Sequence, residues 1–370
     1  MDYQMCSRCV MDTTDPEITF EEMGVCNHCE EWDRRMVNET FMEKNEDRTE
    51  RLAKFVEQVK LDGGCLLGLS GGMDSSYALL KLIELGVKPF ILVYDNGWNT
   101  HVANANISAL IGHFGLEHDV VKINADIYRD VQLAFLRSGV MNAEIPTDHF
   151  LASLLYQVAD RKGLRYIVHG GNVQNESIMP KAWGYDAQDW KHIVEIYSQH
   201  GEKSVREIYK LPHMTLWDWF NYTFLRGIKW FPILNYFDYD PYQAEKELVS
   251  LGWRSYGEKH TESIYTAVFQ QYILPHKFGI DKRRAHYSSL INAGWLERES
   301  ALSLLEKPMT YDSSPWVDYV CKQLKINRGQ FDVWMAQAPV PHEFYASNKL
   351  LLKLAKPVVR LARKVATVSA

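Results

Sequence analysis

Short apolar runs alternate with segments of helical periodicity in the first half of the chain. The apolar runs at 65–69, 89–94, 118–123 and 165–169 have the length of buried strands. The segments at 74–86, at 100–115 and around 148–161 show the spacing of helices and separate these runs. Strands that alternate with helices in this way predict an α/β fold, in which a parallel sheet is flanked by helices.

The pattern changes on both sides of this core. The chain begins with a cysteine-rich segment and a charged stretch, and beyond residue 200 it becomes rich in Trp, Tyr and Phe. We expect four regions: a metal module with a charged linker at 1–45, the α/β core at 46–200, a mainly helical substrate or partner region at 201–340, and a basic amphipathic tail at 341–370.

The tail is basic from residue 347 onward. Residues 347–370 contain no acidic residue, and their cations, interleaved with Leu and Val, are Lys349, Lys353, Lys356, Arg360, Arg363 and Lys364. This composition is typical of an amphipathic helix, which Pro357 would break or kink. Two interpretations stay open: a frayed tail, and a helix that docks on a partner protein or on an anionic membrane surface.

The overall charge disfavours nucleic acid as a partner, although a local basic patch stays open as an alternative. The 370 residues include 41 Lys and Arg and 47 Asp and Glu, so the formal net charge is 41 − 47 = −6. An acidic balance gives no overall attraction to nucleic acid. The sequence also lacks a secretion signal, and no run approaches the roughly 18 to 20 apolar residues of a membrane span. We therefore expect a cytoplasmic protein that does not bind nucleic acid.

Four of the six cysteines form two closely spaced pairs, Cys6 with Cys9 and Cys26 with Cys29. Two residues separate the members of each pair, which is typical of a zinc site with four thiolate ligands. Because four protein ligands close the tetrahedral shell, we expect the zinc to be structural. An iron–sulfur cluster and four free thiols are the alternatives.

A glycine-rich loop, S-G-G-M-D-S-S, joins the first predicted strand to the first predicted helix. Its glycines let the backbone turn sharply and approach an anion, at which the first helix amides point. The predicted nucleotide-binding residues of this loop are Ser70, Gly71, Gly72, Asp74, Ser75 and Ser76. The carboxylate of Asp74 suits a phosphate site only if a cation lies between them, which predicts a magnesium ligand; the alternative is a helix cap.

The loop differs from two common nucleotide motifs. It lacks the lysine of G-x-x-x-x-G-K-[ST], and no G-x-G-x-x-G follows the strand. The S-G-G-x-D-S-S string instead resembles the loop of the N-type ATP pyrophosphatases, the PP-loop enzymes. This resemblance implies an ATP site from which the β- and γ-phosphates leave as pyrophosphate while a substrate oxygen attacks the α-phosphorus.

The resemblance extends to two later segments. It implies adenosine contacts at Asp95, although Asp-Asn-Gly at this point is equally well a simple turn. Gly170, Gly171 and Asn172 resemble the second nucleotide loop of that family, and Glu176 is then a second magnesium ligand.

A cluster of cations near residue 280 is the remaining candidate for chemistry. Lys277, Arg283 and Arg284 lie close together in an acidic chain. Clustered Lys and Arg suit the charge that builds up on a leaving pyrophosphate, so we predict these three residues and Asp74 to be catalytic. A solvated surface cluster is the alternative.

Four segments together resemble one bacterial family, the N-acetyl sugar amidotransferases of lipopolysaccharide O-antigen and surface-sugar biosynthesis. They are CSRCVMDTTDP…CNHC, LSGGMDSS, HGGNVQNE and KFGIDKRR, and the likeness extends over about residues 1–340. The resemblance implies a ligase that uses ATP, Mg²⁺ and ammonia. Its substrate is an N-acetyl sugar, free or nucleotide-linked, whose acetamido group becomes an acetamidino group.

No cysteine of this chain has the setting of a glutaminase nucleophile, and this bears on the source of ammonia. Residue 2 is Asp, so no N-terminal cysteine nucleophile exists, while Cys65 lies in a predicted strand and Cys321 in a helical stretch. Neither has the setting of an activated thiolate. We expect ammonia from a separate glutaminase subunit or from solution.

Two other functions stay open. A tRNA-modifying PP-loop enzyme of the thiolation type also pairs this loop with a cysteine-rich module, but it needs reactive cysteines and a surface that attracts tRNA. A zinc-stabilised adaptor without catalysis would bind ATP and release no pyrophosphate.

Overall fold

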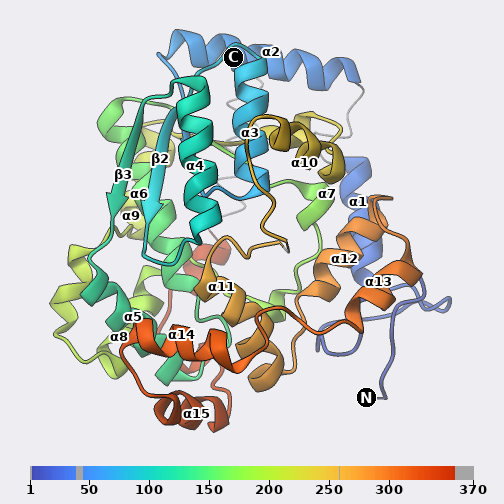
Figure 1. The fold of residues 1–370 in the computed structure, drawn as a ribbon, viewed down its shortest axis with the longest axis vertical. Coiled ribbons are helices and arrows are strands. Elements are labelled where there is room, and N and C mark those ends of the chain that lie inside the picture. Colours follow the sequence, from blue (N-terminus) through green and yellow to red (C-terminus); the bar gives the residue numbers. More distant parts are fainter. Residues whose placement is uncertain (1, 39–44, 258, 355–370) are drawn as a thin grey trace.

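A computed structural model describes residues 2–38, 45–257 and 259–354 (Figure 1). Its centre is a parallel five-stranded sheet with the strand order β3-β2-β1-β4-β5. The strands are β1 (Leu66–Gly68), β2 (Phe90–Asp95), β3 (His118–Lys122), β4 (Tyr166–His169) and β5 (Lys229–Pro232). The first four coincide with the predicted apolar runs, and the α/β fold class is confirmed.

Helices precede, separate and follow the strands. They are α1 (Asn27–Asn38), α2 (Asn45–Leu61), α3 (Met73–Glu84), α4 (His101–Phe114), α5 (Ala125–Ser138), α6 (Ile145–Lys162), α7 (Val173–Glu176), α8 (Trp190–His200), α9 (Leu216–Phe220), α10 (Pro241–Ser250), α11 (Ile264–Val268), α12 (Arg283–Asn292), α13 (Arg298–Leu305), α14 (Ser314–Leu324) and α15 (Arg328–Ala336). Two wider π-helical segments, Asn221–Leu225 and Phe269–Phe278, continue α9 and α11.

The last strand, β5, lies in the region that the sequence predicted to be mainly helical. It pairs with β4 at the edge of the sheet, and its side chains are only partly buried. A short edge strand needs no continuous apolar run, which explains why the pattern did not reveal it. The sheet therefore extends beyond the predicted core at 46–200, although most of the region after residue 240 is helical, as expected.

Helices cover both faces of the sheet because successive strand side chains point to opposite sides. Leu67, Ile91 and Val168 pack with α2, α3, α4 and α10 in one buried cluster. Their neighbours in the strands, Leu66 and Leu92, pack with α6 and α9 in another. The central strands are thus buried on both faces, as their apolar runs predict.

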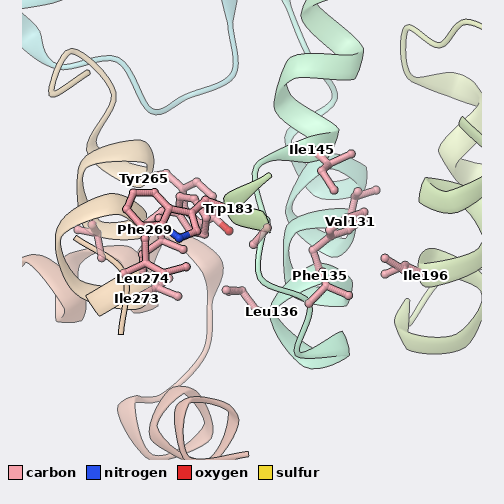
Figure 2. Close-up of a cluster of buried hydrophobic side chains, with 14 of the residues drawn as sticks. Val131, Phe135, Leu136, Ile145, Trp183, Ile196, Tyr265, Phe269, Ile273 and Leu274 are labelled. Carbon is pink, nitrogen blue, oxygen red and sulfur yellow. The ribbon is translucent and has the colours of Figure 1, made fainter. Parts of the chain in front are cut away.

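A third buried cluster lies outside the sheet, in the lower part of Figure 1, where α5, α8, α11 and α14 gather. Figure 2 shows Val131 and Phe135 of α5 near Ile196 of α8. Tyr265 of α11 and Phe269 lie in the same cluster. This cluster joins the C-terminal helices to the α/β core.

The cysteine module docks on the C-terminal helices. Arg298 donates hydrogen bonds to the backbone oxygens of Cys6 (3.0 Å) and Cys9 (3.1 Å). Arg284 donates to the oxygen of Val10 (3.0 Å) and pairs with Asp12 (3.0 Å). The module is therefore held against α12 and α13, far along the sequence.

The ends of the chain are described in part. Residues 349–354 are helical, whereas the rest of the basic tail, including Pro357, lies outside the described residues. The same is true of residues 39–44 in the charged linker. Among the described residues, no helix combines the length and the apolar character that crossing a bilayer requires.

A substitution at Gly170 can test the close contact between the loop after β4 and helix α3. A Cβ at Gly170 would collide with the backbone oxygen of Asp74, so Gly170→Ala should lower the free energy of unfolding by about 1–3 kcal/mol. Gly112→Ala is the control, because Gly112 lies in α4 with no neighbouring atom within 4 Å and alanine favours a helix. Chemical denaturation measures both. A Gly170→Ala variant as stable as wild type would contradict this contact.

Candidate active site

The two loops that the sequence singled out meet at the carboxyl edge of the sheet. The strand order reverses at β1, which pairs with β2 on one side and with β4 on the other. Ligands bind at such points in open parallel sheets, because the loops after the strands diverge there. The loops that diverge here are 70–72, after β1, and 170–172, after β4.

The first loop is fixed by contacts to its backbone. Gly71 has φ +79°, and α4 leaves no room for a Cβ at this position. Its carbonyl oxygen accepts hydrogen bonds from Trp253 Nε1 (3.0 Å) and Asn106 Nδ2 (3.2 Å). The predicted sharp turn is therefore present.

The serine hydroxyls of the loop bond mainly to each other. Ser70 Oγ lies 3.1 Å from Ser75 Oγ and accepts a hydrogen bond from the Gly72 amide (3.2 Å). The Met73 amide donates to the hydroxyl of Tyr256 (3.0 Å). Among the described residues, the buried hydroxyl of Ser76 has no partner. An anion at the start of α3 would compete with the oxygens of Ser70 and Tyr256.

The second loop touches the first turn of α3. The backbone of Gly170 lies against the backbone of Asp74 so closely that only glycine fits. Asn172 is buried, and its side chain bonds back to the Gly170 oxygen (3.4 Å). The Gly171 amide donates to His169 Nδ1 (3.2 Å). The sequence placed these residues in one nucleotide site, and the fold brings them together.

The two predicted magnesium ligands share one cation. Lys259 Nζ lies 3.2 Å from Asp74 Oδ2 and 2.9 Å from Glu176 Oε1. Tyr239 donates a hydrogen bond to Asp74 Oδ1 (2.6 Å). Burial alone would lower the pKa of Lys259, but its attraction to the two carboxylates outweighs this and raises it. Asp74 thus faces Lys259 and Tyr239 instead of capping α3.

Sequence reasoning missed Lys259. It is one lysine in an irregular segment, and neither periodicity nor a motif distinguishes it from a surface cation. Glu262, three residues later, was missed for the same reason. A Cβ on Gly72 would lie 3.0 Å from Glu262 Oε1, so this carboxylate also borders the loop. Burial raises the pKa of Glu262 to about 7.

The three predicted catalytic cations near residue 280 have structural partners. Lys277 Nζ donates to the backbone oxygen of Trp334 (2.6 Å), and burial lowers its pKa. Arg283 pairs with Asp281 (2.8 Å) and donates to backbone oxygens at the end of α13. Arg284 holds the cysteine module. These contacts are to the C-terminal helices and the cysteine module, and the predicted catalytic role of the three cations stays a prediction.

Asp95 lies at the carboxyl end of β2 and forms a turn. Its Oδ1 accepts a hydrogen bond from the Gly97 amide (3.0 Å), and Gly97 has φ +83°. These contacts are those of the turn that the sequence left open as an alternative. The predicted adenosine contact of Asp95 stays a prediction.

The four N-terminal cysteines form one buried cluster. Their Sγ atoms all lie within 4.8 Å of one another, with 3.7 Å between Cys9 and Cys26 and 3.9 Å between Cys6 and Cys29. The backbone amide of Cys26 donates to Cys6 Sγ (3.3 Å), which favours a thiolate. His28 pairs with Asp15 (2.7 Å) and is not part of the cluster. The donor set can hold a metal.

Comparison with protein families identifies the C-terminal part of the chain. Residues 262–358 match the family described as LPS biosynthesis protein WbpG-like, C-terminal domain. The match confirms, for this segment, the resemblance to a lipopolysaccharide-biosynthesis family. It includes α11 to α15 and begins at Glu262, beside the glycine-rich loop. No curated protein sequence matches the chain.

Three solved structures show low similarity. NMN synthetase from Francisella tularensis has 15% identity and a TM-score of 0.29, over 58% of this chain and 99% of that chain. The NH3-dependent NAD synthetase from Campylobacter jejuni has 16% identity and a TM-score of 0.31, over 58% and 100%. The U34-tRNA thiolase NcsA from Methanococcus maripaludis, with its [4Fe-4S] cluster, has 14% identity and a TM-score of 0.33, over 88% and 96%. Values this low assign no ligand or reaction to this chain.

Proposed function

We propose that this chain, whose residues 262–358 form a WbpG-like C-terminal domain, is an ATP-dependent amidotransferase of surface-polysaccharide biosynthesis that acts on an N-acetyl sugar. One observation carries the proposal. The S-G-G-x-D-S-S loop lies where the strand order reverses, and Asp74 and Glu176 face the same cation there. This arrangement suits a polyphosphate bound through a divalent cation.

The proposed reaction proceeds in two balanced steps. The acetamido oxygen attacks the α-phosphorus of ATP, the bond to the β-phosphate breaks, and pyrophosphate leaves. Ammonia then adds to the activated carbon, loses a proton, and AMP leaves with the former acetamido oxygen. An amide needs this activation because its oxygen is otherwise a poor leaving group.

The residues of the chain bind and orient the reactants. Asp74 and Glu176 would hold Mg²⁺, which neutralises charge on the leaving pyrophosphate. A cation bound by these carboxylates would compete with Lys259 for the same oxygens and leave its ammonium group free to pair with a phosphate. The loop amides and serine hydroxyls would supply the remaining donors.

The cysteines outside the cluster argue against a thiol-based reaction. Burial raises the pKa of the Cys65 thiol to about 12 and that of Cys321 to about 11. A thiol of high pKa is mostly protonated at neutral pH and is a poor nucleophile. The raised pKa values of Cys65 and Cys321 therefore argue against sulfur transfer to tRNA and against glutamine hydrolysis by this chain. They support a supply of ammonia from solution or from a separate glutaminase.

Zinc is the metal that we propose for the cysteine cluster. Four buried sulfur ligands close a tetrahedral site and leave no position for a substrate. The cluster also packs on the WbpG-like domain, since Asn292 Nδ2 lies 3.5 Å from Cys29 Sγ. We therefore assign the zinc a structural role that fastens the N-terminus to α12 and α13.

The central test is pyrophosphate release in Asp74→Asn. The substitution keeps the size of the side chain and removes its charge, so Mg²⁺ binding should weaken and the rate should fall roughly a hundredfold or more, with an unchanged circular dichroism spectrum. The assay uses ATP, ammonium chloride and a panel of free and UDP-linked N-acetyl sugars. Wild-type turnover of the variant at saturating Mg²⁺ would show that Asp74 does not hold the metal.

The zinc assignment predicts about one zinc per chain by metal analysis, and a loss of metal and of thermal stability in Cys9→Ser. Cys321→Ser is the matched control, because Cys321 lies in α14 outside the cluster, and it should keep its zinc. An iron–sulfur absorption band in the wild type, or full metal content in a variant with all four cysteines replaced by serine, would contradict zinc ligation.

The ammonia source is tested with the isolated chain. We expect it to use ammonium salts but not glutamine, and at fixed total ammonium its rate should rise with pH because more ammonia is unprotonated. Truncation before Lys349 tests whether the tail docks a glutaminase: ammonium-dependent activity should survive and glutamine-dependent activity with the cognate partner should be lost. Unaided glutamine hydrolysis by the purified chain would refute the expectation.

A further inference from the structure

A second polar cluster borders the glycine-rich loop and has no part in the chemistry described so far. It is formed by side chains from four places in the sequence, namely Tyr94 in β2, Glu144 and Asp148 at the start of α6, Tyr265 in α11, and Lys282 just before α12. Glu144 Oε1 accepts a hydrogen bond from Thr266 (2.7 Å). Glu144 and Asp148 interact electrostatically with Lys282 and with each other.

Two hydroxyl groups in this cluster lack partners. The hydroxyls of Tyr94 and Tyr265 are buried, and neither has a hydrogen-bond partner among the described residues. Tyr265 is only 1% exposed and interacts with Glu144, while Tyr94 interacts with Asp148. A buried hydroxyl without a hydrogen-bond partner costs free energy of folding unless a ligand or a water molecule forms a hydrogen bond with it. Both hydroxyls therefore indicate a ligand that supplies polar groups here.

The cluster can be reached from solvent. The side chain of Asp148, in the first turn of α6, is exposed. Lys282 is half-buried and interacts electrostatically with Glu144 and Asp148. The open side and these charged side chains are both consistent with a binding site.

Glu262 connects the cluster to the glycine-rich loop. Its carboxylate borders Gly72, and Thr266, which bonds to Glu144, follows it by four residues. Glu144 also interacts electrostatically with Glu262, so the cluster lies next to the carboxylate that borders the loop. A molecule held by Glu144 and Tyr265 would therefore lie beside a nucleotide bound at the loop.

The charged groups of the cluster indicate which class of ligand fits it. Two carboxyl groups beside one lysine leave no net positive charge to attract a phosphate or a carboxylate. Glu144 is buried, and burial raises the pKa of its carboxyl group to about 7, so near neutral pH this group can donate as well as accept hydrogen bonds. Together with two tyrosine hydroxyls, such a mixture suits several hydroxyl groups on a neutral ligand.

We propose that Tyr94, Glu144, Asp148, Tyr265 and Lys282 form the binding site for the sugar ring of the acceptor, whose hydroxyl groups they hydrogen-bond beside the glycine-rich loop. The proposal rests on the proposed function, because that function supplies the reason for a neutral polyhydroxylated molecule next to ATP. It assigns these residues to binding and positioning, and not to the reacting atoms.

The test compares Tyr265→Phe and Glu144→Gln with Tyr197→Phe. Tyr265→Phe removes a hydroxyl that bonds to nothing in the protein, so the fold should lose no stability. The glutamine variant keeps an acceptor for Thr266. Tyr197→Phe is the matched control, because its hydroxyl donates to Asp130 (2.8 Å) in another part of the chain, and its removal should lower stability only.

The readouts are calorimetric titration with UDP-N-acetylglucosamine, UDP-N-acetylgalactosamine and the two free sugars, and the KM values for sugar, ATP and ammonium. We expect each cluster variant to weaken sugar binding about tenfold and to leave the KM values of ATP and ammonium unchanged. Tyr197→Phe should melt earlier with wild-type sugar binding. Unchanged sugar affinity in both cluster variants, or a raised KM for ammonium instead, would overturn the proposal.

Failure of the proposed function gives a different result. If the wild-type chain binds a sugar saturably and Tyr265→Phe weakens that binding, but no sugar causes pyrophosphate release, then the site stands and the amidotransferase proposal falls. If pyrophosphate is released and the variants keep the sugar affinity of the wild type, only the site assignment falls. Absence of saturable binding to every sugar in the panel overturns the site assignment.

Discussion

The close contact between the loop after β4 and the first turn of α3 is the constraint on which the candidate active site depends. Because Gly170 has no side chain, its backbone lies directly against that of Asp74. This contact brings Asp74 and Glu176 to one place, although the two residues follow different strands. Without it, the two carboxylates could not share Lys259.

Residues from the second half of the chain complete the site from the other side. Trp253 bonds to the Gly71 carbonyl, Tyr239 to the Asp74 carboxylate, and Tyr256 accepts from the amide of Met73. Lys259 supplies the cation between the two carboxylates. The α/β core and the segment that precedes residues 262–358, which match the WbpG-like family, therefore build the site jointly.

The sequence predicts those features that depend on local pattern. Buried strands read as apolar runs because helices cover both faces of the sheet, and the spacing of Cys6, Cys9, Cys26 and Cys29 reflects the geometry of one metal site. The glycine-rich loop was recognisable because its backbone conformation demands glycine at Gly71.

Features that depend on tertiary packing were not predictable in this way. β5 is a partly exposed edge strand, and Lys259 lies between Asp74 and Glu176 only because the fold brings these three residues together. The structural contacts of Arg283 and Arg284, which bond to backbone oxygens after α13 and in the cysteine module, were also not visible in the sequence. The predicted catalytic role of these cations stays a prediction.

The claim at the centre of this account is that a substrate oxygen attacks the α-phosphorus of ATP and pyrophosphate leaves. Isotope transfer measures this step directly. With an N-acetyl sugar that carries ¹⁸O in its acetamido group, and with ammonium as nucleophile, we expect the label to appear in AMP, as detected by mass spectrometry. Formation of ADP and phosphate, or of AMP without the label, would contradict the account.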